Sequence, residues 1–257
     1  MSKISLFRAA LLVCLFIYSS AYSKAPERYY YQIKVYHLKN KAQEARVDKF
    51  LKDAYLPALH RAGIKQVGVF KPIVQDTSDQ LIYVFTPFRS LDQFQKLSGV
   101  LENDKPALAA GKDYLEALHN DAPYTRIESI LLIAFSAMPK PATPKLDGPM
   151  NQRVYELRSY EAATEMYSEN KIEMFNKYEV DIFKDLNFNA LFYGQVISGS
   201  RMPNLMYMTT FNNQADRDKH WAEFSPVYKK ISVLPEYQNN VSKNVKSFLY
   251  PTDYSDF

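Results

Sequence analysis

The 257-residue chain contains a single cysteine and only seven glycines. The cysteine, Cys14, lies in an N-terminal segment that we expect to be cleaved off, so the mature chain would have no thiol. This excludes disulfides, and it excludes cysteine as a metal ligand or nucleophile. The sequence has no Gly-rich phosphate-binding loop and no Gly-x-Ser-x-Gly motif, which excludes the nucleotide-binding and hydrolase classes that those motifs mark.

Histidine is also scarce, and its distribution is unlike that of a metal site. The four histidines, His37, His60, His119 and His220, show no His-x-x-x-His or related spacing. A single haem ligand at His60 or His220 stays open, but a partly buried or solvated histidine explains each of them more simply. We therefore expect no metal and no cofactor, and the sequence assigns no catalytic residue.

Neither sign of charge dominates the sequence. The chain has 32 Lys and Arg against 28 Asp and Glu, without a basic block or an Arg-rich stripe, so we expect no nucleic-acid partner. Aromatic residues are abundant instead, with 20 tyrosines and 16 phenylalanines. Such a composition indicates bulky cores or a cavity that is lined by aromatic rings.

Residues 1–23 have the pattern of an export signal peptide. Lys3 and Arg8 are the only charges before residue 24, an uncharged apolar run covers residues 9–18, and Ala21-Tyr22-Ser23 resembles a signal-peptidase site. The run is shorter than the roughly 20 apolar residues that span a bilayer. We expect an exported protein, periplasmic or secreted, with no membrane association after cleavage. An uncleaved N-terminal anchor is the alternative.

The sequence repeats itself at one offset. Residues 31–36 (YQIKVY) return as residues 155–160 (YELRSY), and residues 81–84 (LIYV) return as residues 205–208 (LMYM), both 124 positions later. Two matches at the same offset indicate a duplicated unit. Two copies of a small α+β unit can bury their sheets against each other and enclose a cavity.

Hydrophobic periodicity predicts the same element order in both units. In the first unit it indicates strands at 29–38, 66–73, 80–85 and 126–135, with helices at 42–61, 90–101 and 104–118. The second unit has corresponding strands at 153–160, 190–198, 205–211 and 246–250. The order β-α-β-β-α-β is that of a ferredoxin-like fold. We expect Pro57 to kink or end the long helix of the first unit.

Four prolines between residues 139 and 149 predict a stiff, extended linker. We therefore divide the chain into a signal peptide (1–23), a first ferredoxin-like domain (24–139), a linker (140–150) and a second ferredoxin-like domain (151–257).

Several longer motifs resemble those of a known family. They are Arg153–Tyr160, Lys171–Phe175, Arg201–Leu205 and Pro251–Ser255 in the second unit, and Ala45–Phe50 in the first. With them the chain resembles an exported bacterial protein with tandem NIPSNAP domains, of the dimeric α/β-barrel superfamily. The resemblance implies an α+β chain whose two ferredoxin-like units form an intramolecular, pseudo-dimeric barrel. The biochemical activity of the family is not settled, so the resemblance names no reaction.

Polar and apolar residues alternate on the first strand of each unit. Successive side chains of a strand point to opposite faces, so each strand carries two sets. The polar sets are Gln32, Lys34 and Tyr36 in the first unit and Glu156, Arg158 and Tyr160 in the second. We expect the apolar sets, with Tyr31, Ile33 and Val35 and with Tyr155 and Leu157, to pack on the helices. The polar sets would then face the other sheet inside the barrel.

Two interpretations of the polar sets stay open. They could orient a small ligand in a cavity lined by tyrosines, or they could form a buried ion-pair and hydrogen-bond network that determines how the sheets dock. We favour the network, because buried charges are commonly paired for structural reasons. Arg201 and Met202, in the loop before residue 204, are a further candidate ligand clamp, although a rigid turn explains them equally well.

The sequence favours a small-molecule-binding or interaction module over an enzyme with a recognisable catalytic motif. The first alternative is a cofactor-independent, monooxygenase-type oxidoreductase that acts on an aromatic substrate. Haem binding is a weaker alternative. Both alternatives are analogies at the level of the fold, which hosts many functions. A homo-oligomer also stays open.

Export predicts a defined mature N-terminus. If the signal is cleaved after residue 23, the mature protein begins at Lys24. N-terminal sequencing of the protein recovered from the periplasm or medium checks this. An unprocessed N-terminus on protein that stays with the membrane fraction would contradict it.

Overall fold

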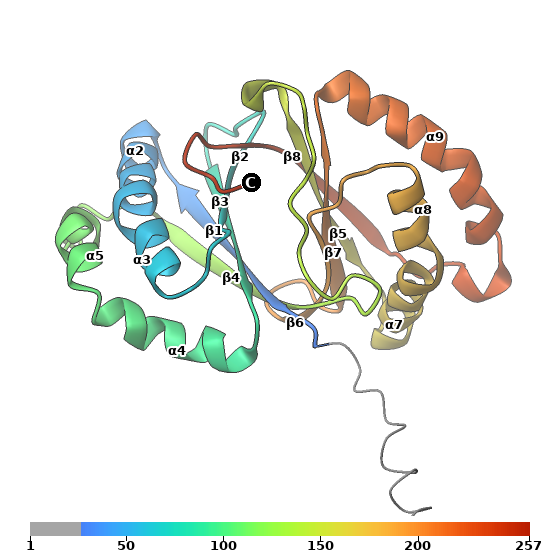
Figure 1. Ribbon diagram of the computed structural model, residues 1–257, viewed down its shortest axis with the longest axis horizontal. Coiled ribbons are helices and arrows are strands. Elements are labelled where there is room, and N and C mark those ends of the chain that lie inside the picture. The colour runs from blue at the N-terminus through green and yellow to red at the C-terminus, as the bar shows by residue number, and fades with distance from the viewer. Residues whose placement is uncertain (1–26) are drawn as a thin grey trace, which may run out of the picture.

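Eight antiparallel strands close into one barrel in the computed structural model, which describes residues 27–257 (Figure 1). The strands are β1 (Tyr30–Leu38), β2 (Gly68–Pro72), β3 (Gln80–Phe88), β4 (Arg126–Ala134), β5 (Val154–Glu161), β6 (Phe192–Ser198), β7 (Asn204–Phe211) and β8 (Lys243–Pro251). Their order around the barrel is β1-β3-β2-β8-β5-β7-β6-β4. Each unit thus supplies four neighbouring strands, which confirms the predicted α+β class and intramolecular barrel. The predicted signal peptide and its cleavage site lie outside the described residues.

The helices cover the barrel on two opposite sides, one for each unit (Figure 1). The first unit has α2 (Lys41–Phe50), the π-helical turn η1 (Leu51–Tyr55), α3 (Leu56–Arg61), α4 (Leu91–Glu102), α5 (Lys105–Ala110) and α6 (Lys112–Leu115). The second has α7 (Glu165–Met174), the π-helical turn η3 (Phe175–Glu179), α8 (Val180–Asp185) and α9 (Gln214–Ser232), with short 3-10 turns η2 (Met150–Gln152) and η4 (Pro235–Tyr237). The side chains of Ser90, Asp104 and Asn213 cap the N-termini of α4, α5 and α9.

The long helix of the first unit continues past Pro57 to Arg61, so the alternative that it would end early at the proline is wrong. A π-helical turn, η1, precedes the proline, which lies in the first turn of α3. The second unit has the equivalent turn η3 124 residues later, and there Asp181 stands in the place of the proline. The π-helical turn is therefore a feature of the repeat and not a consequence of the proline.

Apolar side chains from both units fill the interior of the barrel. The aromatic members of this cluster are Tyr31, Phe70, Phe85, Tyr155, Phe192 and Phe257. The rings of Phe85 and Phe192, one from each unit, stack with centroids 4.8 Å apart. An eight-stranded barrel is just wide enough to be filled in this way, so the interior is a packed core.

The expected orientation of the first strands is therefore wrong. The apolar sets, including Ile33 and Leu157, point into the barrel, where they meet apolar residues of the other unit. The polar sets point outward and lie beneath the helices, where Tyr36 joins the core under α2 and α3. The physical reason is that both faces of the sheet are buried, and the strand pattern alone does not distinguish the two buried sides.

The end of the chain crosses from the second unit to the first. After β8, residues 252–257 continue along the same edge of β2 that β8 pairs with, beside Val67 and Val69 and near the centre of Figure 1. The Asp256 backbone N–H donates to the Val67 carbonyl oxygen at 3.0 Å, and the Val67 N–H donates to Asp256 Oδ2 at 2.8 Å. The ring of Phe257 is buried against Phe85, with centroids 6.0 Å apart. The packing of Phe257 against Phe85 therefore connects the second unit to the first.

Replacing Phe257 by Ala tests this attachment. Loss of a buried aromatic side chain typically costs about 3 kcal/mol or more of the free energy of unfolding, and urea unfolding measures it. The matched control is Leu118→Ala, because Leu118 is 68 % exposed and should change the free energy by less than about 0.5 kcal/mol. Equal effects of the two substitutions would show that the tail contributes no packing energy.

Candidate functional site

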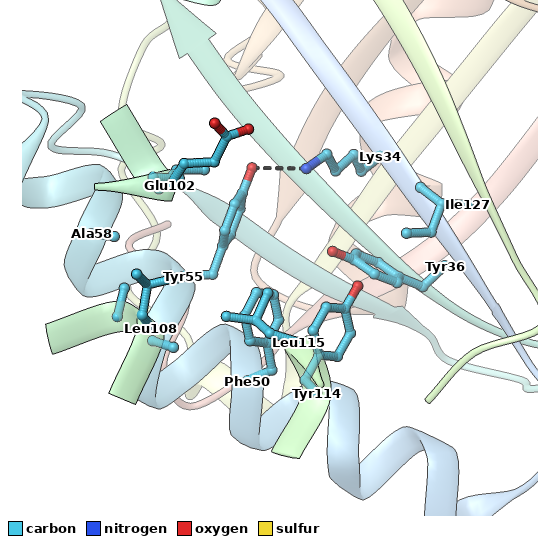
Figure 2. Close-up of a pocket in the computed structure, with 13 residues that line it drawn as sticks. Lys34, Tyr36, Phe50, Tyr55, Ala58, Glu102, Leu108, Tyr114, Leu115 and Ile127 are labelled. Atoms are coloured by element: carbon cyan, nitrogen blue, oxygen red, sulfur yellow. Dashed lines mark hydrogen bonds between the residues drawn. The ribbon is translucent and has the colours of Figure 1, made fainter. Parts of the chain in front are cut away.

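An open pocket of about 250 Å³ lies in the first unit, between the outer face of the sheet and the helices. Its floor comes from β1 and β4, and its walls come from η1, from α3, α5 and α6, and from the last residues of α2 and α4 (Figure 2). Lys34 and Tyr36 project from the strand into this space (Figure 2). Two of the residues that the sequence proposes for ligand binding therefore line a real cavity, but this cavity lies outside the barrel.

Lys34 supplies the positive charge of the pocket. Its Nζ donates to the hydroxyl of Tyr55 at 3.0 Å and lies 4.7 Å from the centre of the Tyr55 ring. Within residues 27–257, no carboxylate lies within 4.0 Å of this ammonium group. Glu102 lines the same pocket, but from the exposed end of α4. The half-buried ammonium group thus has a hydroxyl partner and no counter-ion in the described chain.

Two phenols lie on the opposite side of the pocket from Tyr55. Tyr36 is buried on β1 and Tyr114 lies on α6, with their hydroxyl groups turned toward the same space (Figure 2). Burial raises the pKa of each phenol above its ordinary value. Both hydroxyl groups therefore stay protonated at neutral pH and can donate hydrogen bonds.

In the second unit, the corresponding polar set forms a buried network under α9. Glu156 is fully buried, and its Oε1 lies 2.6 Å from Arg158 Nη2. From α9, Arg217 Nε and Trp221 Nε1 donate to Glu156 Oε2 at 2.8 and 2.7 Å. The guanidinium of Arg158 also lies 3.5 Å from the centre of the Trp221 ring. This arrangement fits the structural interpretation of the polar set.

The charges of this network keep Glu156 ionised. Burial by itself would raise the pKa of Glu156, but the hydrogen bond from Arg217 and the charge of Arg158 outweigh it and hold that pKa below its usual value. A second buried pair lies beside the network, where Lys171 Nζ is 2.5 Å from Glu179 Oε1 and 3.1 Å from the Tyr228 hydroxyl. The second unit thus fills the space between sheet and helices with its own paired charges.

The other predicted residues lie apart from the pocket. Gln32 is buried and donates from Nε2 to Ser129 Oγ at 2.7 Å, while Tyr160 shares a hydrogen bond of 2.8 Å with the Tyr207 hydroxyl. Arg201 and Met202 lie in the loop between β6 and β7. Arg201 lines a separate cavity of about 140 Å³ at one end of the barrel. The structure therefore divides the predicted set among three places.

Of the residues that line the pocket, the sequence analysis predicted only Lys34 and Tyr36, and among those that it missed are Ala54, Tyr55, Ala58 and Tyr114. A comparison of equivalent residues of the two units, 124 positions apart, could have identified two of them. Ala54 and Ala58 are small, whereas Tyr178 and Ile182 stand at the equivalent positions of the second unit. A change from large to small residues on a buried helix face leaves space.

Neither a metal cluster nor a membrane-spanning helix is found in the part of the chain that the structure describes. In residues 27–257, no three His, Cys, Asp or Glu side chains gather in a way that could hold a metal ion. Over the same residues, no helix is long and apolar enough to cross a bilayer.

Comparison with protein families supports the resemblance seen in the second unit. Residues 155–256 match the NIPSNAP family model. The second ferredoxin-like unit therefore carries a NIPSNAP domain, while the assignment of the first unit to the same family stays a prediction. No curated protein matches the sequence.

Solved structures share the fold of the whole described chain. A proposed monooxygenase from Fusobacterium nucleatum superposes with a TM-score of 0.57 at 12% identity, over 88% of this chain and 93% of that one. A proposed monooxygenase from Lactobacillus acidophilus gives 0.52 at 12% identity, over 88% and 94%. An anthrone oxidase-like protein gives 0.52 at 8% identity, over 89% and 93%. At such identities the similarity shows the fold alone, and it confirms the α/β barrel.

The substitution Glu156→Gln tests the network in the second unit. It leaves the buried guanidinium of Arg158 without its counter-ion and removes one of the two carboxylate partners of Arg217. This should lower the free energy of unfolding by about 3 kcal/mol at pH 7. The pKa of Glu156 is lower in the folded state than in the unfolded state. The contribution of this carboxylate to the free energy of unfolding is therefore fully present above the unfolded-state pKa of about 4.3, and it is lost as the pH falls through the folded-state pKa. The difference between the two proteins should therefore shrink at about pH 3.

Urea unfolding at both pH values makes the measurement. Glu165→Gln is the matched control, because Glu165 is exposed in the first turn of α7. A Glu156→Gln penalty of the same size at both pH values would contradict the ionised, paired state of this carboxylate.

Proposed function

We propose that this NIPSNAP-domain protein is a binding module that holds a small molecule with an apolar body in the pocket of its first unit. The observation that carries the proposal is the contrast between the units. The same layer between sheet and helices contains an open pocket of about 250 Å³ in the first unit, whereas side chains fill it in the second. A volume of this size approaches the roughly 300–1,000 Å³ of typical ligand sites.

The lining of the pocket supports an apolar ligand body. Phe50, Leu108 and Leu115 form walls around the few polar atoms, and Ile127 adds an apolar side chain on the floor. Part of this surface is exposed, since Leu108 and Leu115 are 41% and 47% accessible to solvent. Apolar surface around an open cavity gains free energy when a ligand removes it from water. A few convergent polar groups in an apolar cavity are the usual composition of a small-molecule site.

A second candidate function is oxygenation of an aromatic substrate without a metal. Two observations favour it: the solved structures with this fold include proposed monooxygenases and an anthrone oxidase-like protein, and the pocket places Lys34 opposite two phenols. An ammonium group in an apolar cavity can stabilise a substrate phenolate. Oxygen consumption by the purified protein with quinol-type substrates would favour this activity over simple binding.

Export of the protein remains part of the proposal.

Obstructing the pocket tests the binding proposal. Leu108→Trp places a larger ring at the mouth, and it should weaken binding of the neutral dye Nile red at least tenfold in a fluorescence titration. Val100→Trp is the matched control, because Val100 is exposed to a similar extent on α4 but does not line the pocket. Thermal unfolding followed by circular dichroism shows whether both variants are folded. Dye binding that is unchanged in a folded Leu108→Trp variant would contradict the proposal.

A further inference from the structure

We infer that the ligand of the first-unit pocket is an organic anion, a carboxylate with an apolar body, and that Lys34 recognises its charge. The inference rests on the proposed function, because it names the ligand class of the same pocket. It depends on a comparison between the two units. The elements from β1 to β3 in the first unit recur 124 residues later as the elements from β5 to β7 in the second.

The second unit neutralises its own cations. Arg158 occupies the position of Lys34, and Glu156, two residues earlier on the strand, pairs with it at 2.6 Å. A second acid, Glu179, lies at the end of η3 and pairs with Lys171 at 2.5 Å. Every buried cation in this layer of the second unit therefore has a carboxylate from the same chain.

The first unit keeps the strand cation, Lys34, but has lost the acid that pairs with its equivalent in the second unit. It has also lost the pair of Glu179 and Lys171, since Val47 stands in the place of Lys171. Gln32 stands in the place of Glu156, and Tyr55 stands in the place of Glu179. Both replacements are neutral, and Tyr55 offers Lys34 a hydroxyl group at 3.0 Å. Burying a charge is costly unless a counter-charge accompanies it. A ligand carboxylate in the adjacent cavity would supply the counter-charge that Glu156 supplies in the second unit.

The geometry gives such a carboxylate more than one donor. The Tyr55 oxygen accepts a hydrogen bond from Lys34 Nζ, so its own proton is free to point toward the cavity. An oxyanion beside Lys34 would thus meet an ammonium group and a phenolic hydroxyl on the same side. Charge-assisted hydrogen bonds of this kind are roughly twice as strong as neutral ones.

The negative charge of Glu102 does not reverse the preference of the pocket for an anionic ligand. Glu102 is the acidic residue among those that line the pocket, and it lies on the exposed end of α4. Its carboxylate is more than 4.0 Å from Lys34 Nζ, and solvent screens a charge at the rim. Lys34 projects from the strand at the floor (Figure 2), so a bound ligand would direct its carboxylate inward and its apolar body toward the helices.

A pair of ligands with the same shape tests the charge. We would titrate the full protein with 2-naphthoate and with the neutral 2-naphthamide, each in competition with Nile red. The wild-type protein should bind the carboxylate at least tenfold more tightly than the amide. Lys34→Met should abolish this preference while the affinity for the amide changes less than about twofold.

Three further variants separate charge recognition from a general effect on folding. Lys34→Arg keeps the charge and should keep the preference. Gln32→Glu copies the acid of the second unit, and it should reduce the preference by pairing with Lys34. Lys105→Met, which removes an exposed cation of α5 that does not line the pocket, should leave both affinities unchanged.

The outcomes distinguish this inference from the proposed function. Equal affinities for naphthoate and naphthamide, or a preference that survives in Lys34→Met, would overturn the anionic ligand while Nile red binding still supports the pocket. A wild-type protein that binds neither 2-naphthoate, nor 2-naphthamide, nor Nile red would overturn both proposals. A preference that Lys34→Met removes and Lys34→Arg retains supports the inference.

Discussion

The closure of the barrel between the two units is the constraint on which the rest of the structure depends. Each ferredoxin-like sheet has two edges, and unpaired edges are open to pairing with other chains. Here β2 pairs with β8 and β4 pairs with β6, so that each edge of one unit is covered by the other. The interior then becomes a core common to both units, and the tail that carries Phe257 adds one more connection across it. Because the inside is filled, space for a ligand is left under the helices or at the ends of the barrel.

The two units use the layer under their helices differently. In the second unit, Glu156, Arg158 and α9 form a network with no counterpart in the first. In the first unit, Gln32 and two alanines replace an acid and two large residues, and a pocket with one ammonium group results. One unit thus has its charges satisfied internally, whereas the other presents a charge to a cavity.

Much of the fold could be predicted from the sequence. The 124-residue offset and the hydrophobic periodicity of the strands and helices indicated the ferredoxin-like order and the barrel, and the structure confirms them. The prediction that the polar sets of the first strands face the barrel interior was wrong. A period of two shows which residues of a strand share a face, but not whether that face meets the barrel interior or the helices. Ala54 and Ala58 were missed for a related reason, since a small residue in a helix reveals a cavity only when its surroundings are known. Lys34 and Tyr36 were identified, although for a cavity inside the barrel.

The most direct test is a crystal structure of the full protein with 2-naphthoate bound. The account predicts the ligand between β1 and the helices of the first unit, with a carboxylate oxygen about 2.7–3.2 Å from Lys34 Nζ and with the space beneath α9 unchanged. A ligand seated at the end of the barrel beside Arg201, or a carboxylate turned away from Lys34, would contradict the account.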